Sequence, residues 1–170
     1  MMPRIRLKGF ADVEVVRGDE LIETLASSYS HAGVDDTIVI TRSNKRANIY
    51  NIGIRNQVLG REEMLCSGDQ LMVVKNNYSL TAAEKDPTAP PFIANGDRCR
   101  VGRVRAIREL YGFSFAEARL VFPDYDDYEI ETTVLLSTLT SEAPALARDD
   151  QERLYQAVMA DYAAFSRKSA

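Results

Sequence analysis

The chain has 170 residues, of which 45% are hydrophobic and 27% charged, and its formal net charge at pH 7 is −4. This composition is typical of a globular protein with a real core and excludes a collagen-like, disulfide-framed or wholly disordered chain. The negative charge argues against nucleic-acid wrapping over the whole surface, and no apolar run reaches membrane-spanning length. With two cysteines in no metal spacing and no signal peptide, we expect a reduced, cytoplasmic protein without a membrane contact.

The first third of the chain predicts α/β structure. Residues 4–16 favour one or two short strands. Apolar residues at helical spacing follow, and they predict a helix that Asp19 caps and Gly33 ends. Residues 36–41, DTIVIT, are apolar and β-branched, as expected of a buried strand.

A second helix is predicted directly after this apolar run. Ser43 or Asn44 caps it, and Gly60 ends it. Its predicted apolar face consists of Ala47, Tyr50, Ile54 and Val58.

The pattern changes to a period of two over residues 68–136. This alternation predicts four or five short antiparallel strands, which suit a small barrel of SH3-like or OB-like type. The arginines of RCRVGRVRAIR switch from even to odd positions at Gly102, so we expect a β-bulge at Gly102 and Arg103. Residues 78–91 predict a long loop or hairpin arm, and PDYDD at 123–127 predicts a turn.

The tail predicts a helix. Asp149 with Glu152 three residues later resembles a capping box. The apolar stripe of this helix, expected to be core or to pack against a neighbour, consists of Leu154, Tyr155, Val158, Tyr162 and Phe165.

Several kinds of catalytic site find no support in the sequence. The single histidine, His31, belongs to no recognisable triad, and no cysteine and histidine cluster suits zinc. No Gly-x-x-x-x-Gly-Lys-Ser/Thr loop is present to hold nucleotide phosphates. We therefore name no catalytic residue and no metal ligand.

The predicted helix after residue 41 begins at a concentration of basic and amide side chains. Free N–H groups and the positive dipole end favour an anion there, and Arg42 and Lys45 add formal charge. Asn44 and Asn48 share one helix face and both can reach a phosphate. The simpler alternative is an ordinary capped helix with solvated basic residues.

Two strands that open with Gly-Asp form the second notable feature. The first ends in the exposed donors Lys75, Asn76 and Asn77, and the second begins with an NGD turn at 95–97. Five arginines follow, and they either track a nucleic-acid backbone or pair with acidic residues across a hairpin. The arginines are Arg98, Arg100, Arg103, Arg105 and Arg108; the acidic residues are Asp124, Asp126, Asp127, Glu129 and Glu131. Tyr78, Phe92 and Tyr111 either stack on bases or pack in the core.

Four segments in order resemble the C-terminal half of superfamily 1 DNA helicases of the RecD/Dda-like (exodeoxyribonuclease V alpha-subunit-like) group. They are VITRSNKRANIYNIGIR, SGDQLMVVKNNY, FIANGDRCRV and TLTSEAPALARDDQERLYQAVMADY. The resemblance implies an ATP-dependent helicase, a hydrolase of DNA repair that binds ATP and Mg²⁺ and moves along single-stranded DNA. The P-loop and the other motifs of the first RecA-like domain are missing, so we expect a fragment that does not hydrolyse ATP alone.

The resemblance also implies a fold of the α/β plus all-β class. Residues 1–67 correspond to part of the second RecA-like domain, and 68–136 to an inserted SH3-like antiparallel barrel. Residues 137–170 correspond to a C-terminal helical segment that returns to the RecA-like part. The expected partners are single-stranded DNA and the remainder of the helicase chain, and the oligomeric state stays open.

The roles of individual residues follow from the same resemblance. Arg42 matches a basic residue near the γ-phosphate of ATP in the parent protein. The DNA-binding positions expected from the resemblance are Ser43, Asn44, Lys45, Asn48, Lys75, Asn76, Asn77, Asn95 and Gly96, to which the arginine strand adds Arg100 and Arg103. For Asn76 and Asn77 we favour a role in fixing the barrel entry, because amides satisfy loop backbone groups.

Two other functions remain open on the sequence alone. The chain is a free-standing small-barrel module that binds a protein or RNA partner, or it is an architectural domain whose arginines are all in ion pairs.

Overall fold

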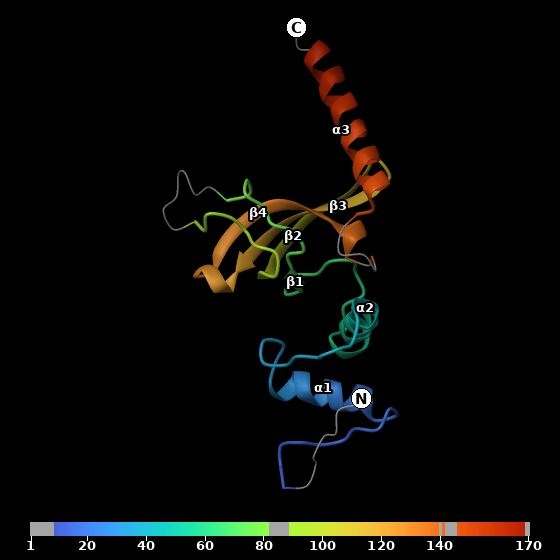
Figure 1. Ribbon diagram of the computed structural model, residues 1–170, viewed down its shortest axis with the longest axis vertical. Helices are drawn as coiled ribbons and strands as arrows, with labels where there is room; N and C mark the ends of the chain where they lie inside the picture. Colours follow the sequence, from blue (N-terminus) through green and yellow to red (C-terminus); the bar gives the residue numbers. More distant parts are fainter. Residues whose placement is uncertain (1–8, 82–88, 140, 142–145, 169–170) are drawn as a thin grey trace. The chain divides into compact units, whose positions relative to one another are not determined.

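The computed structural model describes residues 9–81, 89–139, 141 and 146–168, with side chains as far as residue 162 (Figure 1). The chain divides into two compact units, Met1–Glu62 and Glu63–Ala170. The described elements are mixed α and β, with the helices α1 and α2 in the first unit and a four-stranded sheet and α3 in the second.

Helix α1, Leu21–His31, lies where the sequence predicts it and ends as predicted. Gly33 takes a φ of +87°, and its N–H donates to the carbonyl of Tyr29. The predicted cap is wrong by one residue, because Glu20 is the N-cap and makes no side-chain cap bond. Asp19 is instead held by Arg17, whose guanidinium donates to its carboxylate at 3.2 Å.

Helix α2, Asn44–Gly53, begins at the predicted cap: the Ser43 hydroxyl accepts from the N–H of Arg46 at 3.3 Å. The helix continues as a π-helical segment, Ile54–Val58, in which the N–H of Leu59 reaches back to the carbonyl of Ile54. Gly60, at a φ of +62°, then ends it as predicted. Ile54 is buried, and the segment that contains it contacts α1.

The strands predicted in the first unit are not formed. Residues 9–16 and 36–41 belong to neither helix nor strand, and residues 4–8 lie outside the described part of the chain. The side chains of Ile38 and Ile40 are 83% and 87% exposed, although the pattern predicts a buried strand. A strand requires a neighbour for its N–H and C=O groups, and the described residues of this unit contain none.

The second unit contains the predicted antiparallel sheet. Its strands are β1, Gln70–Met72; β2, Arg98–Leu110; β3, Phe113–Phe122; and β4, Tyr128–Leu135. They are hydrogen-bonded in chain order, and Figure 1 shows that the sheet is curled. No pairing joins β1 to β4 among the described residues, so these strands form a half-barrel, which is consistent with the expected small barrel-like element.

The predicted bulge is confirmed. The register of β2 against β3 shifts between Val101 and Arg103, and a second shift follows between Val104 and Ala106. The turn between β2 and β3 is a tight one, with positive φ at both Tyr111 (56°) and Gly112 (76°).

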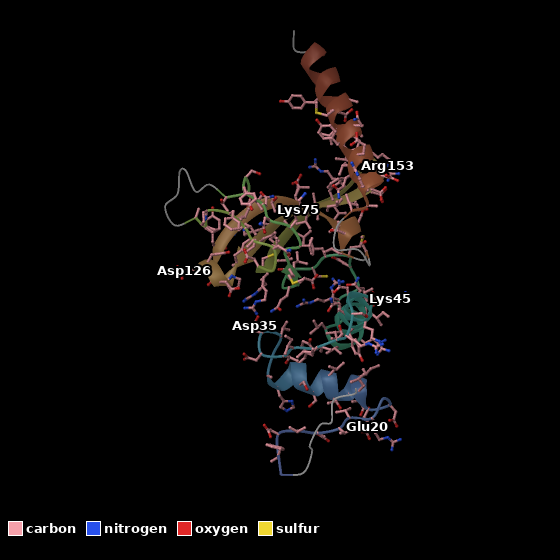
Figure 2. All side chains as sticks on the ribbon, in the orientation of Figure 1. Glu20, Asp35, Lys45, Lys75, Asp126 and Arg153 are labelled. Atoms are coloured by element: carbon pink, nitrogen blue, oxygen red, sulfur yellow. The ribbon has the colours of Figure 1, made fainter. Side chains whose placement is uncertain are left out.

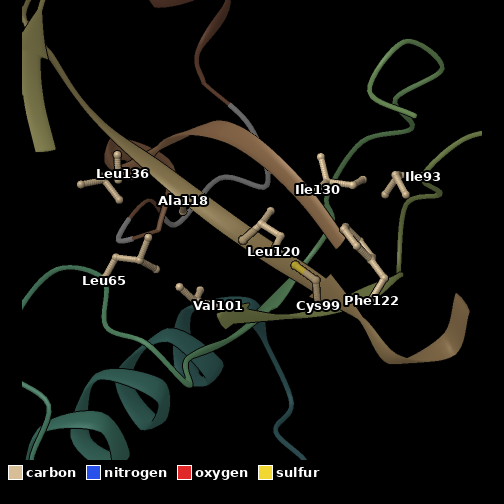
Figure 3. Packing of buried hydrophobic residues seen from close by; sticks show 10 residues of the cluster. Leu65, Ile93, Cys99, Val101, Ala118, Leu120, Phe122, Ile130 and Leu136 are labelled. Carbon is tan, nitrogen blue, oxygen red and sulfur yellow. The ribbon is translucent and has the colours of Figure 1, made fainter. Parts of the chain in front are cut away.

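The core of this unit lies on one face of the sheet (Figure 3). Every second residue of β3 is buried from Ala116 to Phe122, as the alternation predicts. The cluster comprises Leu65, Ile93, Cys99, Val101, Ala116, Ala118, Leu120, Phe122, Ile130 and Leu136.

Helix α3, Arg148–Lys168, forms the tail. The predicted capping box is wrong, because Asp149 lies inside the first turn, where its charge favours the helix dipole without capping it. The Arg153 guanidinium stacks over the Phe113 ring at 4.9 Å, and the Tyr111 hydroxyl donates to Asp161 at 2.5 Å. Of the predicted apolar stripe, Leu154 is half-buried and Tyr155, Val158 and Tyr162 are exposed, while the Phe165 side chain lies outside the described residues. No helix in the described residues is both long and apolar enough to cross a bilayer.

Candidate nucleic-acid interface

The N-terminus of α2 presents the first group of predicted site residues. The Ser43 cap fixes this end, so Asn44 and Lys45 occupy the first two helical positions, and Lys45 is labelled on this helix in Figure 2. Arg42, Asn44 and Lys45 are exposed, and Asn48 is half-buried one turn further on. The end therefore combines solvent-facing positive charge with the N–H groups of a first helical turn.

The two Gly-Asp sequences close equivalent loops in the second unit. The Asp69 carboxylate, which is 4% exposed, accepts from the N–H of Cys66 at 2.8 Å. The Asp97 carboxylate accepts from the N–H of Ala94 at 2.7 Å and from the Tyr125 hydroxyl at 2.8 Å. Each aspartate thus satisfies a backbone donor three residues earlier, which fixes the start of the strand that follows.

Asp97 also changes the titration of its neighbours. Its hydrogen bond raises the pKa of the Tyr125 hydroxyl above 10.0, since the carboxylate accepts the proton that ionisation removes. Burial, followed by the negative charge of Asp97, raises the pKa of the Cys99 thiol to about 11. Cys99 is therefore a neutral core residue, as predicted, and Cys66 is partly buried.

Asn76 and Asn77 both hold loop backbone, which is the role favoured for them from the sequence. The Asn76 side-chain oxygen accepts from the N–H of Asn95 at 2.8 Å. The Asn77 side-chain oxygen accepts from the N–H groups of Ser79 and Leu80 at 3.0 and 2.9 Å. The Asn76 bond joins the end of the first Gly-Asp strand to the turn before the second, and the Asn77 bonds fix the loop that follows it. Lys75, labelled in Figure 2, is exposed beside them.

Ion pairs hold Arg98, Arg105 and Arg108 of β2. Arg98 pairs with Asp124 at 3.4 Å and Arg105 with Glu131 at 2.7 Å, as the hairpin alternative expects. Arg108 pairs at 3.1 Å with Glu117 of β3, which is outside the acidic group proposed from the sequence. Because these side chains are roughly half exposed, each pair contributes only about 0–1 kcal/mol. A phosphate can therefore compete for such arginines at low cost.

Arg103 differs from these three arginines, and Arg100 is exposed on the same strand. Both are exposed, and no ion pair joins Arg103 to a described residue. In the register of β2 and β3, Arg103 lies opposite Arg119, whose own charge is shared with Glu129 and Glu131. The bulge therefore leaves Arg103 as an uncompensated positive charge on the sheet.

The line of residues that continues β1 has an exposed apolar side that the sequence analysis did not identify. Met72, Val74 and Tyr78 are 65%, 44% and 70% exposed, while Leu71 and Val73 pack against the core. Of these three, the sequence analysis names only Tyr78, as a residue that either stacks on bases or packs in the core. Tyr111 takes no part in this line, because its hydroxyl is bonded to Asp161 of α3.

The described residues contain no cluster of side chains suited to metal binding. No group of three or more His, Cys, Asp or Glu side chains among them is placed to hold a metal ion. A hollow of about 190 Å³ on the sheet is lined by Arg105, Glu117, Ala118, Glu131, Thr132 and Thr133, and its charged groups are in the ion pairs described above. His31 closes α1, where its Nδ1 lies 2.8 Å from the carbonyl oxygen of Ser27.

Comparison with protein-family models, with curated proteins and with solved structures gives no significant match. The helicase resemblance therefore stays a prediction from the residues, and so do the nucleic-acid roles of the site residues.

Proposed function

We propose that this chain supplies part of the single-stranded DNA grip of an ATP-dependent helicase of the RecD/Dda-like group. In this proposal the ATP and Mg²⁺ are held by other parts of the parent protein, and Arg42 faces the nucleotide. The 170-residue chain binds DNA without hydrolysing ATP, since phosphoryl transfer requires a P-loop and metal ligands that its sequence lacks.

The exposure of Ile38 and Ile40 is the observation that carries the proposal. Two β-branched side chains more than four-fifths exposed in one short run are unfavourable in water, and burying one fully contributes about 1.5–3 kcal/mol. Such a run is what remains when a strand lacks its sheet. The run leads directly to the capped helix end with Arg42 and Lys45. In the proposed parent protein, neighbouring strands would cover the run, and the helix end would then lie next to the nucleotide and the DNA.

The uncompensated charge on the half-barrel supports the DNA part of the proposal. Arg103 is exposed on a bulge and forms no ion pair with a described residue. Positive charge of this kind is suited to a phosphate backbone, whereas an architectural domain would pair all of its arginines.

A free-standing module that binds protein or RNA is the second candidate. It is favoured by the second unit, Glu63–Ala170, which has a hydrophobic cluster of its own. This candidate gives no account of the exposed residues 38 and 40 in the first unit.

Fluorescence anisotropy with labelled single-stranded DNA, duplex DNA and single-stranded RNA tests the proposal. We expect binding to single-stranded DNA at low salt, weakened about three- to tenfold by Lys45→Glu and by Arg103→Glu, since each removes a phosphate contact. Arg17→Glu is the matched control with the same charge change, and it should alter affinity less than about twofold. Preference for RNA with all three variants unchanged would favour the module, and no binding to any nucleic acid would contradict the proposal.

A further inference from the structure

An exposed apolar line on the half-barrel has no role in the interface described above. We define the Tyr78 strip as Met72, Val74 and Tyr78, with exposed fractions of 65%, 44% and 70%. Met72 ends β1 and Val74 follows two residues later, while Tyr78 lies beyond a bend at Lys75 and stands against the ring of Phe92. Such a line of large apolar side chains on a sheet marks an interaction surface.

The strip is held in place by the second Gly-Asp strand. The β1–β2 register pairs Met72 with Arg98, and further along the chain an isolated bridge pairs Asn77 with Ile93, next to the aromatic pair Tyr78 and Phe92. The backbone bonds between Val73 and Asp97 and between Asn77 and Ile93 connect these points. Both ends of the strip are therefore held by β2 and by the segment that leads into it.

Tyr78 is oriented although it is exposed. Its ring lies 5.1 Å from that of Phe92 at an angle of 32°, and its hydroxyl accepts from the Asn76 side-chain nitrogen at 2.9 Å. The Asn77 side-chain oxygen accepts from the N–H groups of Ser79 and Leu80, which fixes the backbone directly after Tyr78. An aromatic ring that is fixed yet 70% exposed loses little conformational entropy when another planar group stacks on it.

The charges beside the strip identify the kind of partner. Side chains directly opposite each other in an antiparallel pair share a face, so Arg98 lies beside Met72, and Arg100 lies beside Gln70. Arg98 is bound to Asp124 only through an exposed pair at 3.4 Å, which a phosphate can replace. Aromatic and apolar side chains next to arginines are the combination that binds stacked bases and a phosphate backbone together.

We propose that the Tyr78 strip is a base-stacking track for single-stranded nucleic acid, with Tyr78 as the stacking residue and Arg98 and Arg100 as its phosphate contacts. This inference rests on the proposed function and adds the residues that contact bases, beyond the charges that contact phosphates. A second copy of the chain and another protein segment are the competing occupants, and the experiment separates them.

The test compares binding of the 170-residue chain to an oligothymidylate of about 20 nucleotides and to an abasic strand of the same length. We expect tighter binding to the oligothymidylate. Tyr78→Ala should weaken that binding about 5- to 150-fold, as removal of one base–aromatic stack does, and leave the abasic strand bound as before. Tyr78→Phe should stay within about threefold of the wild type, because it keeps the ring and loses only the bond from Asn76.

Two further variants distinguish a loss of base stacking from a loss of folding. Tyr78→Leu keeps an apolar contact with Phe92 and should still lose the preference for bases. Tyr155→Ala, at an exposed tyrosine of α3, should bind like the wild type within about twofold. Circular dichroism of each variant shows whether the chain remains folded.

The inference and the proposed function fail in different ways. If the wild type binds and Lys45→Glu and Arg103→Glu weaken it, but Tyr78→Ala does not, only the stacking track is overturned. Equal losses on both strands would also overturn it, since they would mark Tyr78 as structural. Self-association of the wild type that Tyr78→Ala abolishes, with no change in DNA affinity, would assign the strip to a second copy. No DNA binding by the wild type overturns both proposals.

Discussion

Replacement of Asp97 by alanine should destabilise the half-barrel, because one carboxylate holds two elements at the start of β2. It accepts from the N–H of Ala94 at 2.7 Å and from the Tyr125 hydroxyl at 2.8 Å. Hydrogen bonds to a charged acceptor contribute about 1.5–3 kcal/mol each, and partial exposure places both at the lower end. We therefore expect Asp97→Ala to lower the free energy of unfolding by about 3 kcal/mol, and Tyr125→Phe by about 1–1.5 kcal/mol.

Urea denaturation followed by circular dichroism measures both changes. With a slope of about 1.5 kcal/mol per molar urea, Asp97→Ala should lower the midpoint by about 2 M. The double variant should be no less stable than Asp97→Ala alone, because the Tyr125 bond is already lost. If the urea midpoint of Asp97→Ala lay within about 0.3 M of the wild type, the Asp97 carboxylate would not be what stabilises this loop.

The pH dependence provides a second measurement of the same bond. The pKa of Tyr125 is raised above 10.0 by its bond to Asp97, so the bond stabilises the folded chain below pH 10. This stability is lost as the pH rises through the raised pKa. The difference between the wild type and Tyr125→Phe should therefore be constant near neutrality and disappear in strong alkali; a difference that persists there would contradict the bond.

The remaining predictions concern the α2 cap, the two cysteines and the exposed isoleucines. Ser43→Ala should cost about 1 kcal/mol of stability and lower the α2 signal in circular dichroism, whereas Ser43→Asp should not, because aspartate also caps; equal losses would exclude the cap. Because burial raises the pKa of the Cys99 thiol to about 11, iodoacetamide near pH 8 should modify Cys66 first, as mass spectrometry of peptides would show; faster modification of Cys99 would contradict its burial. Ile38→Asn should change the stability of the 170-residue chain by less than about 0.5 kcal/mol, and a loss above about 2 kcal/mol would show that this side chain is buried in solution.

The parts of the fold that depend on near neighbours in sequence were predictable. The alternation of β3 identified its buried side from Ala116 to Phe122, and the change of arginine phase identified the bulge at Gly102. Gly33, Ser43 and Gly60 mark helix ends through backbone preferences that act within a few residues. These features needed no knowledge of distant contacts.

The predictions were wrong where a structure depends on residues distant in sequence, or where several neighbouring residues suit the same position equally well. Residues 36–41 have the composition of a buried strand, but no neighbouring strand pairs with them among the described residues. The start of α3 was misplaced because several acidic residues suit a first turn equally well, and the helix begins at Arg148.

The candidate site was predicted in part. The arginine positions on β2 followed from the sequence, and so did the acidic partners of Arg98 and Arg105, Asp124 and Glu131, whereas the pairing of Arg108 with Glu117 did not. Of the Tyr78 strip, the sequence singled out Tyr78 as a stacking candidate but not Met72 and Val74, because a run of apolar residues does not reveal which of its sides is covered. Only the core contacts of Leu71 and Val73 distinguish the two sides.

The central claim is that this chain grips single-stranded DNA through exposed positive charge on α2 and on the half-barrel. The most direct test is the affinity of the 170-residue chain for single-stranded DNA as the salt concentration rises from about 50 to 200 mM. With three or four phosphate contacts, we predict a slope of log affinity against log salt of about −2 to −3, reduced in magnitude by about 0.7 in Arg103→Glu. A slope near zero, or one that Arg103→Glu leaves unchanged, would contradict the account.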